Sequence, residues 1–221
     1  MARKEFPLSF VESQIRIEKQ AKEDYYKKNP DSLVLSFERD LADMGFTFET
    51  SSQALALMPR CKEWLLPIIV SYYNRAKQEK RYNEQNHFLG FFCHKGLDEV
   101  IPMLIKDFWS SDTPDLTKWF ISDCIYLIQS KSFVNDYMEI ILCKRFGINR
   151  QMIVLLLGKI KEESAIPALI QLLDDDLVRI QAITALGYYK REEFRIIFER
   201  FSSSKSIGER NAAKAALKKL S

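Results

Sequence analysis

The sequence is short of glycine, which occurs only seven times in 221 residues. Sheets and phosphate-binding loops use more glycine in their turns, so this count favours helices. No apolar run approaches the roughly 20 residues that a membrane-spanning helix needs. Residues 1–7 include basic side chains but no apolar stretch follows them, so we expect no signal peptide. These absences predict a cytoplasmic protein without a membrane partner.

Cysteine and histidine are also scarce, with four cysteines and two histidines. The cysteines at 61, 93, 124 and 143 form no C-x-x-C pair, which favours reduced thiols in a reducing compartment. A zinc site made of Cys61, His87, Cys93 and His94 would match no known ligand spacing. A pairing of His94 as base with a cysteine nucleophile is a further hypothesis, but no carboxylate has a diagnostic spacing. We therefore predict no metal and no cofactor.

The usual catalytic motifs are missing. The sequence contains no G-x-S-x-G, Walker loop, H-E-x-x-H or dinucleotide-binding fingerprint. The formal net charge is only +3, but residues 141–221 hold 15 Lys and Arg against 9 Asp and Glu. This uneven charge permits an acidic partner without requiring one. The composition, 47% hydrophobic and 29% charged, is that of a globular protein.

A repeat is present in the last third of the chain. The segment from Arg150 to Gly158 aligns with Arg179 to Gly187 after a shift of 29 residues, and with Arg210 to Leu217 after a further 31. The shared apolar positions place one stripe along a helix whose arginine lies near its start. The pattern predicts stacked helices, with second helices at 164–173 and 192–201 between them.

Three prolines head similar apolar segments: Pro67, Pro102 and Pro167. Proline is tolerated in the first turn of a helix, because the N–H that it lacks has no partner there. Each proline therefore predicts a helix start, with Ser164 as the N-cap before Pro167. Met138 and Arg195 fit the same position in two units without proline. Together with the three prolines they give five such positions, which predict about five helix pairs. Around Pro67 the alternative is one kinked helix over residues 60–74.

Residues 176–187 resemble the first helix of a HEAT-like repeat, D-x-V-R-x-x-A-x-x-A-L-G, and residues 166–175 resemble the second helix of the preceding unit. The pattern is similar to the short HEAT repeats of bilin lyases and of many bacterial scaffold proteins. It is specific over 150–221, weaker over 86–149 and only suggestive over 52–85. The resemblance implies an all-α, right-handed α-solenoid with convex first helices and concave second helices. It implies an interaction platform without particular chemistry.

The N-terminal segment departs from the repeat. A polar helix is predicted over residues 9–28, a turn with an N-cap over 29–32, and a helix over 33–44 that Gly45 ends. We interpret residues 1–50 as an N-terminal helical cap and residues 51–221 as one continuous domain of repeats. At the other end, Ser206 and Glu209 form a predicted capping box for the last helix.

Aromatic and basic residues on the predicted second helices are candidates for a partner surface. They are Tyr72, Tyr73, Arg75, Lys106 and Trp109. Tyrosine, tryptophan and arginine are favoured in protein interfaces. We therefore predict a monomeric, non-enzymatic module that binds another protein along the concave face.

Arg150, Arg179 and Arg210 form the clearest polar column. Their structural interpretation follows the resemblance, since HEAT-like repeats use this arginine with a preceding acidic residue, here Asp175 or Asp176, to tie neighbouring turns. Alternatively, the guanidinium groups could bind phosphate or carboxylate.

Trp119 and Asp123 suggest a different function. HEAT-like alkylpurine DNA glycosylases carry a similar W-x-x-x-D after an I-P-x-L segment, and here residues 101–104 precede the pair. The resemblance would make Trp119 and Asp123 catalytic and the protein a nucleic-acid binder. No second tryptophan adjoins Trp119, and residues 1–140 are acidic overall. The competing interpretation places Trp119 in the core and Asp123 in solvent.

Overall fold

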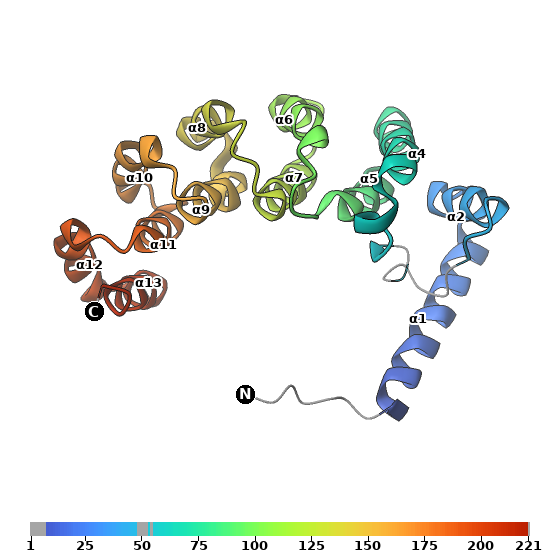
Figure 1. Cartoon of the computed structure of the whole chain (residues 1–221), viewed down its shortest axis with the longest axis horizontal. Helices are drawn as coiled ribbons and strands as arrows, with labels where there is room; N and C mark the ends of the chain where they lie inside the picture. The colour runs from blue at the N-terminus through green and yellow to red at the C-terminus, as the bar shows by residue number, and fades with distance from the viewer. Residues whose placement is uncertain (1–7, 48–52, 54, 221) are drawn as a thin grey trace. The chain divides into compact units, whose positions relative to one another are not determined.

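The computed structural model describes residues 8–47, 53 and 55–220, and its regular structure in these ranges is helical throughout. The chain forms two compact units, residues 1–91 and 92–221 (Figure 1). Within the described ranges no strand is present, so the predicted all-α fold is confirmed. The division into a cap of residues 1–50 and a single repeat domain stays a prediction.

In the part of the first unit that the structure describes, the helices are α1 (Leu8–Lys28), α2 (Leu33–Asp43), α4 (Met58–Gln78) and α5 (Tyr82–Leu89). Helix α2 packs on both α4 and α5. Phe37 of α2 lies at the centre of the contact and meets the rings of Tyr72, Phe88 and Phe91 edge to face. Burial of these aromatic side chains stabilises this unit.

The predicted limits of α1 and α2, residues 9–28 and 33–44, agree with the structure to within one residue. The Ser32 side chain accepts hydrogen bonds from the backbone N–H groups of Val34 and Leu35, as an N-cap does. After α2, Gly45 has a φ of 89°, and its N–H donates to the carbonyl of Ala42. This left-handed conformation favours glycine and ends the helix.

The prediction that Pro67 starts a helix is wrong. Pro67 is the tenth residue of α4, and the helix contains a residue with non-helical angles at Cys61 (φ −122°, ψ 19°). The alternative interpretation, one helix through this region with a kink, agrees with the structure. The apolar side chains around Pro67, such as Leu65 and Ile69, remain buried on the same face.

The second unit is a series of helix pairs with short 3₁₀ turns before several of them. Its helices are α6 (Ile101–Trp109), α7 (Asp115–Ile128), α8 (Val134–Leu142), α9 (Gln151–Lys159), α10 (Ile166–Gln171), α11 (Arg179–Tyr189), α12 (Arg195–Ser202) and α13 (Ile207–Leu217). Pro102 and Pro167 are each the second residue of their helix, as predicted. The two marks without proline do not occupy this position, because Met138 is the fifth residue of α8 and Arg195 the first of α12.

Ser164 is not the N-cap of the helix that contains Pro167. It lies inside the 3₁₀ turn η4 (Glu163–Ala165), and α10 begins after Ala165. The Glu162 carboxylate caps this turn instead, since it accepts hydrogen bonds from both the N–H and the hydroxyl of Ser164. The longer glutamate side chain reaches both donors, which shifts the cap two residues towards the N-terminus.

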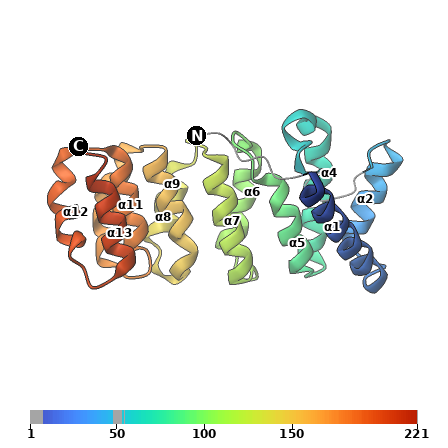
Figure 2. The same cartoon turned by 90° about the horizontal axis from the view of Figure 1, so that it is seen from below.

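Two rows of helices make up the second unit. Helices α7, α9, α11 and α13 lie side by side along the inner side of its curve, and α6, α8, α10 and α12 lie along the outer side (Figures 1 and 2). The helices with the repeated arginines at or near their starts, α9, α11 and α13, are therefore inner helices. The expectation that they are convex is wrong.

Small residues explain why the arginine helices form the inner row. A Cβ atom added to Gly158 of α9 would lie 2.5 Å from the Cα atom of Ala185 on α11. Gly187 of α11 would likewise meet Ala216 of α13 at 2.9 Å. These pairs let the inner helices approach closely, whereas larger buried side chains such as Phe198 fill the outer row. Because the inner helices lie closer together than the outer helices, the second unit curves towards the inner row.

This close packing predicts that Gly158→Ala destabilises the protein. The new methyl group would overlap the backbone of α11, and we expect a net loss of about 1–3 kcal/mol despite the better helix propensity of alanine. Chemical denaturation measures the loss. The matched control is Gly208→Ala, whose new methyl group would meet only the flexible end of the Ile180 side chain. Equal effects of the two substitutions would contradict the packing argument.

Candidate functional site

Exposed apolar side chains lie along the rim of the second unit where the inner helices begin. We call this set the apolar rim; its members are Leu116, Ile148, Leu177, Ile180 and Ile207, with exposed fractions of 37% to 67%. Single exposed apolar residues are common on protein surfaces, but here they recur at the start of successive repeats. Ile148 and Leu177 each lie two residues before a repeated arginine, 29 residues apart.

Contacts between neighbouring helix starts join the segments that carry the apolar rim. Asn149 donates a hydrogen bond to Asp115 at 3.3 Å, which joins the start of α9 to that of α7. Gln151 donates to the carbonyl of Leu177 at 2.7 Å, which joins α9 to the turn before α11. The Ile180 side chain lies next to Gly208 at the start of α13. The exposed side chains therefore form a row rather than isolated points.

A second row, of tyrosine and lysine, marks the opposite ends of the inner helices. The Nζ atom of Lys159 lies 4.1 Å from the ring centroid of Tyr126, and that of Lys219 lies 4.5 Å from the centroid of Tyr188. We call these four residues the tyrosine–lysine row. Burial first, and then the proximity of Tyr126, raises the pKa of Tyr188. The row presents ammonium groups held against aromatic faces.

Beneath the rim, Arg150 is fully buried and bonded at each end of its guanidinium group. It donates to the carbonyls of Gly147 and Ile141 at 2.9 and 2.8 Å, and to the Asp175 carboxylate at 2.7 Å. Asp175 also accepts a hydrogen bond from the N–H of Leu177. One guanidinium group thus connects the end of α8, the turn before α9 and the turn before α11.

Arg179 repeats this arrangement one unit later. It donates to the carbonyl of Leu173 at 2.5 Å and to Glu209 at 3.1 Å, and it also pairs with Asp176. Arg210, in the last unit, donates to the carbonyls of Ser204 and Lys205. We call these three arginines with their acceptors the arginine ladder. The guanidinium N–H groups of the ladder donate these hydrogen bonds to acceptors within the protein.

The capping box predicted at the start of α13 forms only in part. The N–H of Glu209 donates to the Ser206 hydroxyl, but the Glu209 carboxylate accepts from Ser204 and Arg179. The N–H of Ser206 donates to Ser204 instead. The ladder therefore takes the carboxylate that the reciprocal half of the box would need.

The structure places two of the predicted partner-binding residues in the core. Tyr73 is 0% exposed and Tyr72 is 9% exposed, with its hydroxyl donating to Asp40 at 2.7 Å. This burial corrects the expectation that they contact a partner. Tyr72 faces α2, where its ring meets that of Phe37. Arg75 is exposed and pairs with Glu79 on its own helix.

The other two predicted residues, Lys106 and Trp109, belong to the outer helix α6. Lys106 is exposed, and the Trp109 ring lies against both the Phe146 ring and the guanidinium group of Arg145. They are therefore not on the inner row to which the sequence assigned them. The apolar rim was missed because single exposed apolar residues carry no signal by themselves; the 29-residue spacing of Ile148 and Leu177 was the available clue.

Trp119 and Asp123 lie one turn apart on the inner helix α7. Trp119 is 39% exposed, so its predicted place in the core is wrong, and Asp123 is half-buried. Desolvation raises the pKa of the Asp123 carboxyl group. The exposed indole adds an aromatic side chain to the inner row without supplying a second catalytic group.

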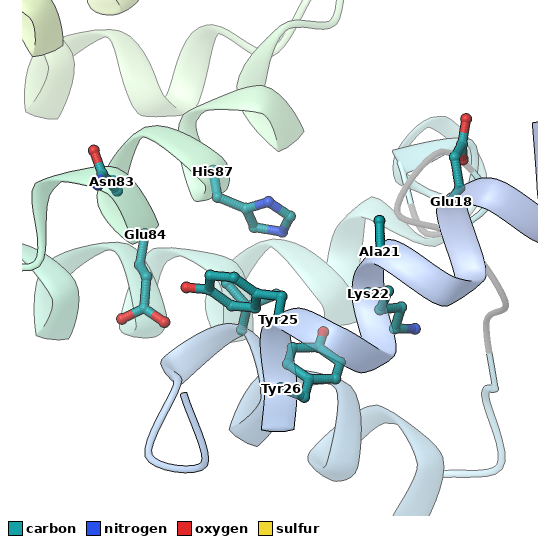
Figure 3. A pocket seen from close by; sticks show the side chains of 9 residues that line it. Glu18, Ala21, Lys22, Tyr25, Tyr26, Asn83, Glu84 and His87 are labelled. Carbon is teal, nitrogen blue, oxygen red and sulfur yellow. The ribbon is translucent and has the colours of Figure 1, made fainter. Parts of the chain in front are cut away.

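A cavity of about 430 Å³ lies in the first unit between α1, α2 and α5. The rings of Tyr25 and His87 point into it (Figure 3). Two of the charged groups at its wall have partners within the protein: Glu84 accepts from Ser32 and pairs with Arg81, and Lys22 pairs with Glu38. Burial lowers the pKa of His87, which keeps the imidazole neutral near pH 7. This cavity therefore has aromatic side chains in its wall, and its Lys22 and Glu84 are paired within the protein.

Among the described residues, no three His, Cys, Asp or Glu side chains are placed to share a metal ion. In the same ranges, none of the helices has the length and apolar character that crossing a membrane requires.

Comparison with known families identifies the repeats. Residues 138–218 match the family described as HEAT repeats. The match supports a HEAT-like repeat family over these residues, and HEAT repeats stack into α-solenoids. No curated protein and no solved structure matches the chain. The right-handed sense of the solenoid and the number of about five pairs stay predictions.

The arginine ladder predicts graded losses of stability. Arg150→Ala removes a fully buried guanidinium group and leaves Asp175 and two carbonyls without their donor, so we expect a loss of about 3–5 kcal/mol. Arg179 is partly exposed, and for Arg179→Ala we expect about 1–3 kcal/mol. Urea denaturation measures both. Unchanged unfolding of Arg179→Ala together with lost partner binding would make this arginine a binding residue instead.

The ladder also predicts acid sensitivity. Burial acts to raise the pKa of Asp175, but hydrogen bonds from Arg150 and from the N–H of Leu177 produce a net lowering. The pKa of Glu209 is lowered by Ser204 and, against burial, by Arg179. A lowered folded-state pKa stabilises the protein above the unfolded value of about 4, and this stability is lost as the pH falls through the folded value.

The melting temperature should therefore fall between pH 5 and strongly acidic pH. Arg179→Ala should show a smaller fall than the wild type, because its Glu209 loses the cation that lowers its pKa. Parallel melting curves for the two proteins across this range would show that the ion pair makes no contribution.

Proposed function

We propose that this chain is a non-enzymatic scaffold that binds another protein along the apolar rim. HEAT repeats in general are protein-interaction scaffolds, and the match covers three of the four inner helices. The observation that carries the proposal is the row of exposed side chains at Leu116, Ile148, Leu177, Ile180 and Ile207. Solvent exposure of such a row costs free energy that a partner would recover.

The partner proposed is a protein segment with apolar side chains and acidic residues. Apolar side chains would fill the spaces along the rim, where contact removes both surfaces from water. Acidic side chains would meet the basic end of the inner helices, because Lys159 and Lys219 belong to a region with a balance of +6. The proposal includes a monomeric scaffold in the cytoplasm, as expected from the sequence.

The polar groups of the arginine ladder are bonded inside the protein, whereas the exposed rim is apolar. This division supports binding rather than catalysis. The guanidinium groups of Arg150 and Arg179 donate to carbonyls and carboxylates of the protein itself. The rim side chains, in contrast, have no polar chemistry to offer. An arrangement of this kind recognises a partner by shape and apolar contact.

Substitution of the rim tests the proposal. In a pull-down from lysate with the full chain as bait, Leu177→Ser combined with Ile207→Ser should lower recovery of the partner about tenfold or more, because two apolar contacts are lost. Quantitative mass spectrometry compares each captured protein with the wild-type bait. Both side chains are exposed, so the fold should be unaffected.

The matched control is Ile196→Ser, which changes a 79% exposed isoleucine on the outer helix α12. It should leave recovery unchanged. The proposal fails if every protein captured by the wild type is captured equally by the rim variant, or if the purified protein turns over a substrate.

Nucleic-acid binding is the second candidate function, and the exposure of Trp119 beside the half-buried Asp123 favours it. An exposed indole can stack on a base, and the tyrosine–lysine row could meet phosphates. Salt separates the two candidates, because phosphate contacts release counterions and weaken steeply between about 50 and 200 mM salt.

We expect no measurable binding of duplex DNA at about 150 mM salt and no release of alkylated purines, measured by fluorescence anisotropy and by chromatography of released bases. Tight, salt-dependent binding that persists in Asp123→Asn would support a non-catalytic nucleic-acid platform. Base release that Asp123→Asn abolishes would support a glycosylase.

A further inference from the structure

Two thiols in the second unit lie close enough to react with each other. The Sγ atoms of Cys93 and Cys124 are 2.9 Å apart, although 31 residues separate them in the sequence. A disulfide bond is about 2.0 Å long, so the sulfur atoms need to approach by only about 0.9 Å. Both cysteines are reduced in the structure.

Two hydrogen bonds fix the segment after Cys93 against the end of α7 and so keep the two thiols close together. The N–H of Gly96 donates to the carbonyl of Ile128 at 3.0 Å, and the Ser130 hydroxyl donates to Asp98 at 2.6 Å. Both hydrogen bonds join the segment that follows Cys93 to the end of α7, the helix that carries Cys124. The short distance therefore follows from the position of the backbone, because a cysteine side chain is too short to compensate for a distant one.

The two thiols differ in access to solvent. Cys93 is half-buried, whereas Cys124 is 1% exposed. The hydrogen bond with Cys93 and burial raise the pKa of the Cys124 thiol. A dissolved oxidant therefore meets Cys93 first and leaves Cys124 as the second thiol of the pair.

We propose that Cys93 and Cys124 form a reversible intramolecular disulfide when the protein meets a peroxide. The Cys93 thiolate attacks one oxygen of hydrogen peroxide, the O–O bond breaks, and water leaves after protonation. This step oxidises Cys93 to the sulfenic acid. The Cys124 sulfur then attacks the Cys93 sulfur and loses its proton, the S–O bond breaks, and a second water leaves. Two thiols and one peroxide give one disulfide and two waters; a thiol reductant reverses the change.

The disulfide would close a loop that contains α6 and the first part of α7, including Leu116 of the apolar rim. Closing such a loop restricts the unfolded chain and stabilises the folded one. Oxidation should therefore raise the melting temperature of the protein.

Peptide mapping after exposure of the full chain to hydrogen peroxide tests the proposal. We expect the intact protein to lose two hydrogen atoms and a tryptic digest to contain a peptide pair linked through Cys93 and Cys124. Dithiothreitol should restore both thiols. In Cys124→Ser, Cys93 should accumulate as a sulfenic acid that dimedone labels, whereas in Cys93→Ser the buried Cys124 should stay unmodified.

The matched control is the double variant Cys61→Ser with Cys143→Ser, which keeps only the proposed pair and should form the linked peptide at the wild-type rate. Circular dichroism establishes that each variant is folded. The proposal is overturned if peroxide produces no linked peptide, if Cys61 or Cys143 reacts first, or if Cys93 proceeds to the sulfinic acid without a link.

Discussion

The buried guanidinium group of Arg150 is the interaction on which the second unit depends. A charge that is fully removed from water must be paired and hydrogen-bonded, and Arg150 meets this need with two carbonyls and the Asp175 carboxylate. Its partners belong to three successive segments of the chain. None of these segments can move independently without leaving the charge uncompensated, so one side chain fixes the register between repeats.

The inner-row spacing follows from this register together with the glycine–alanine contacts. Gly158 and Gly187 let α9, α11 and α13 approach at backbone distance, and Arg150 and Arg179 tie the starts of these helices to the turns around them. In the turns before Arg150 and Arg179, the residue two positions before the arginine then faces solvent. Exposure of Ile148 and Leu177 is thus a geometric result of the frame, and it leaves an apolar surface over an internally satisfied polar layer.

Much of this architecture was predictable from local chemistry. The repeated arginines, Pro102, Pro167, Ser32 and Gly45 each signal a local event, a helix start or end, whose physics needs no tertiary information. The Pro67 segment resembles the other two in sequence, yet the helix continues through it, because the packing of α4 outweighs the cost of an interior proline.

The candidate site was harder to predict, because burial depends on which helices meet. Tyr73 and Trp119 both lie on helices with apolar stripes, but Tyr73 is fully buried while Trp119 stays exposed on the inner row. Which row is the inner one also follows from contacts between distant helices, which the pattern within one repeat does not contain. Predicting the apolar rim would have required both the 29-residue spacing and the exposure of its side chains.

Site-specific photo-crosslinking tests the central claim, that the rim rather than the outer row contacts the partner. A photo-reactive phenylalanine analogue would replace Leu177 in one version of the protein and Ile196 in another, and each would be irradiated in lysate. A partner bound along the rim gives a discrete crosslinked protein from position 177 and none from position 196. The same crosslinked protein from both positions, or one from position 196 alone, would contradict this claim.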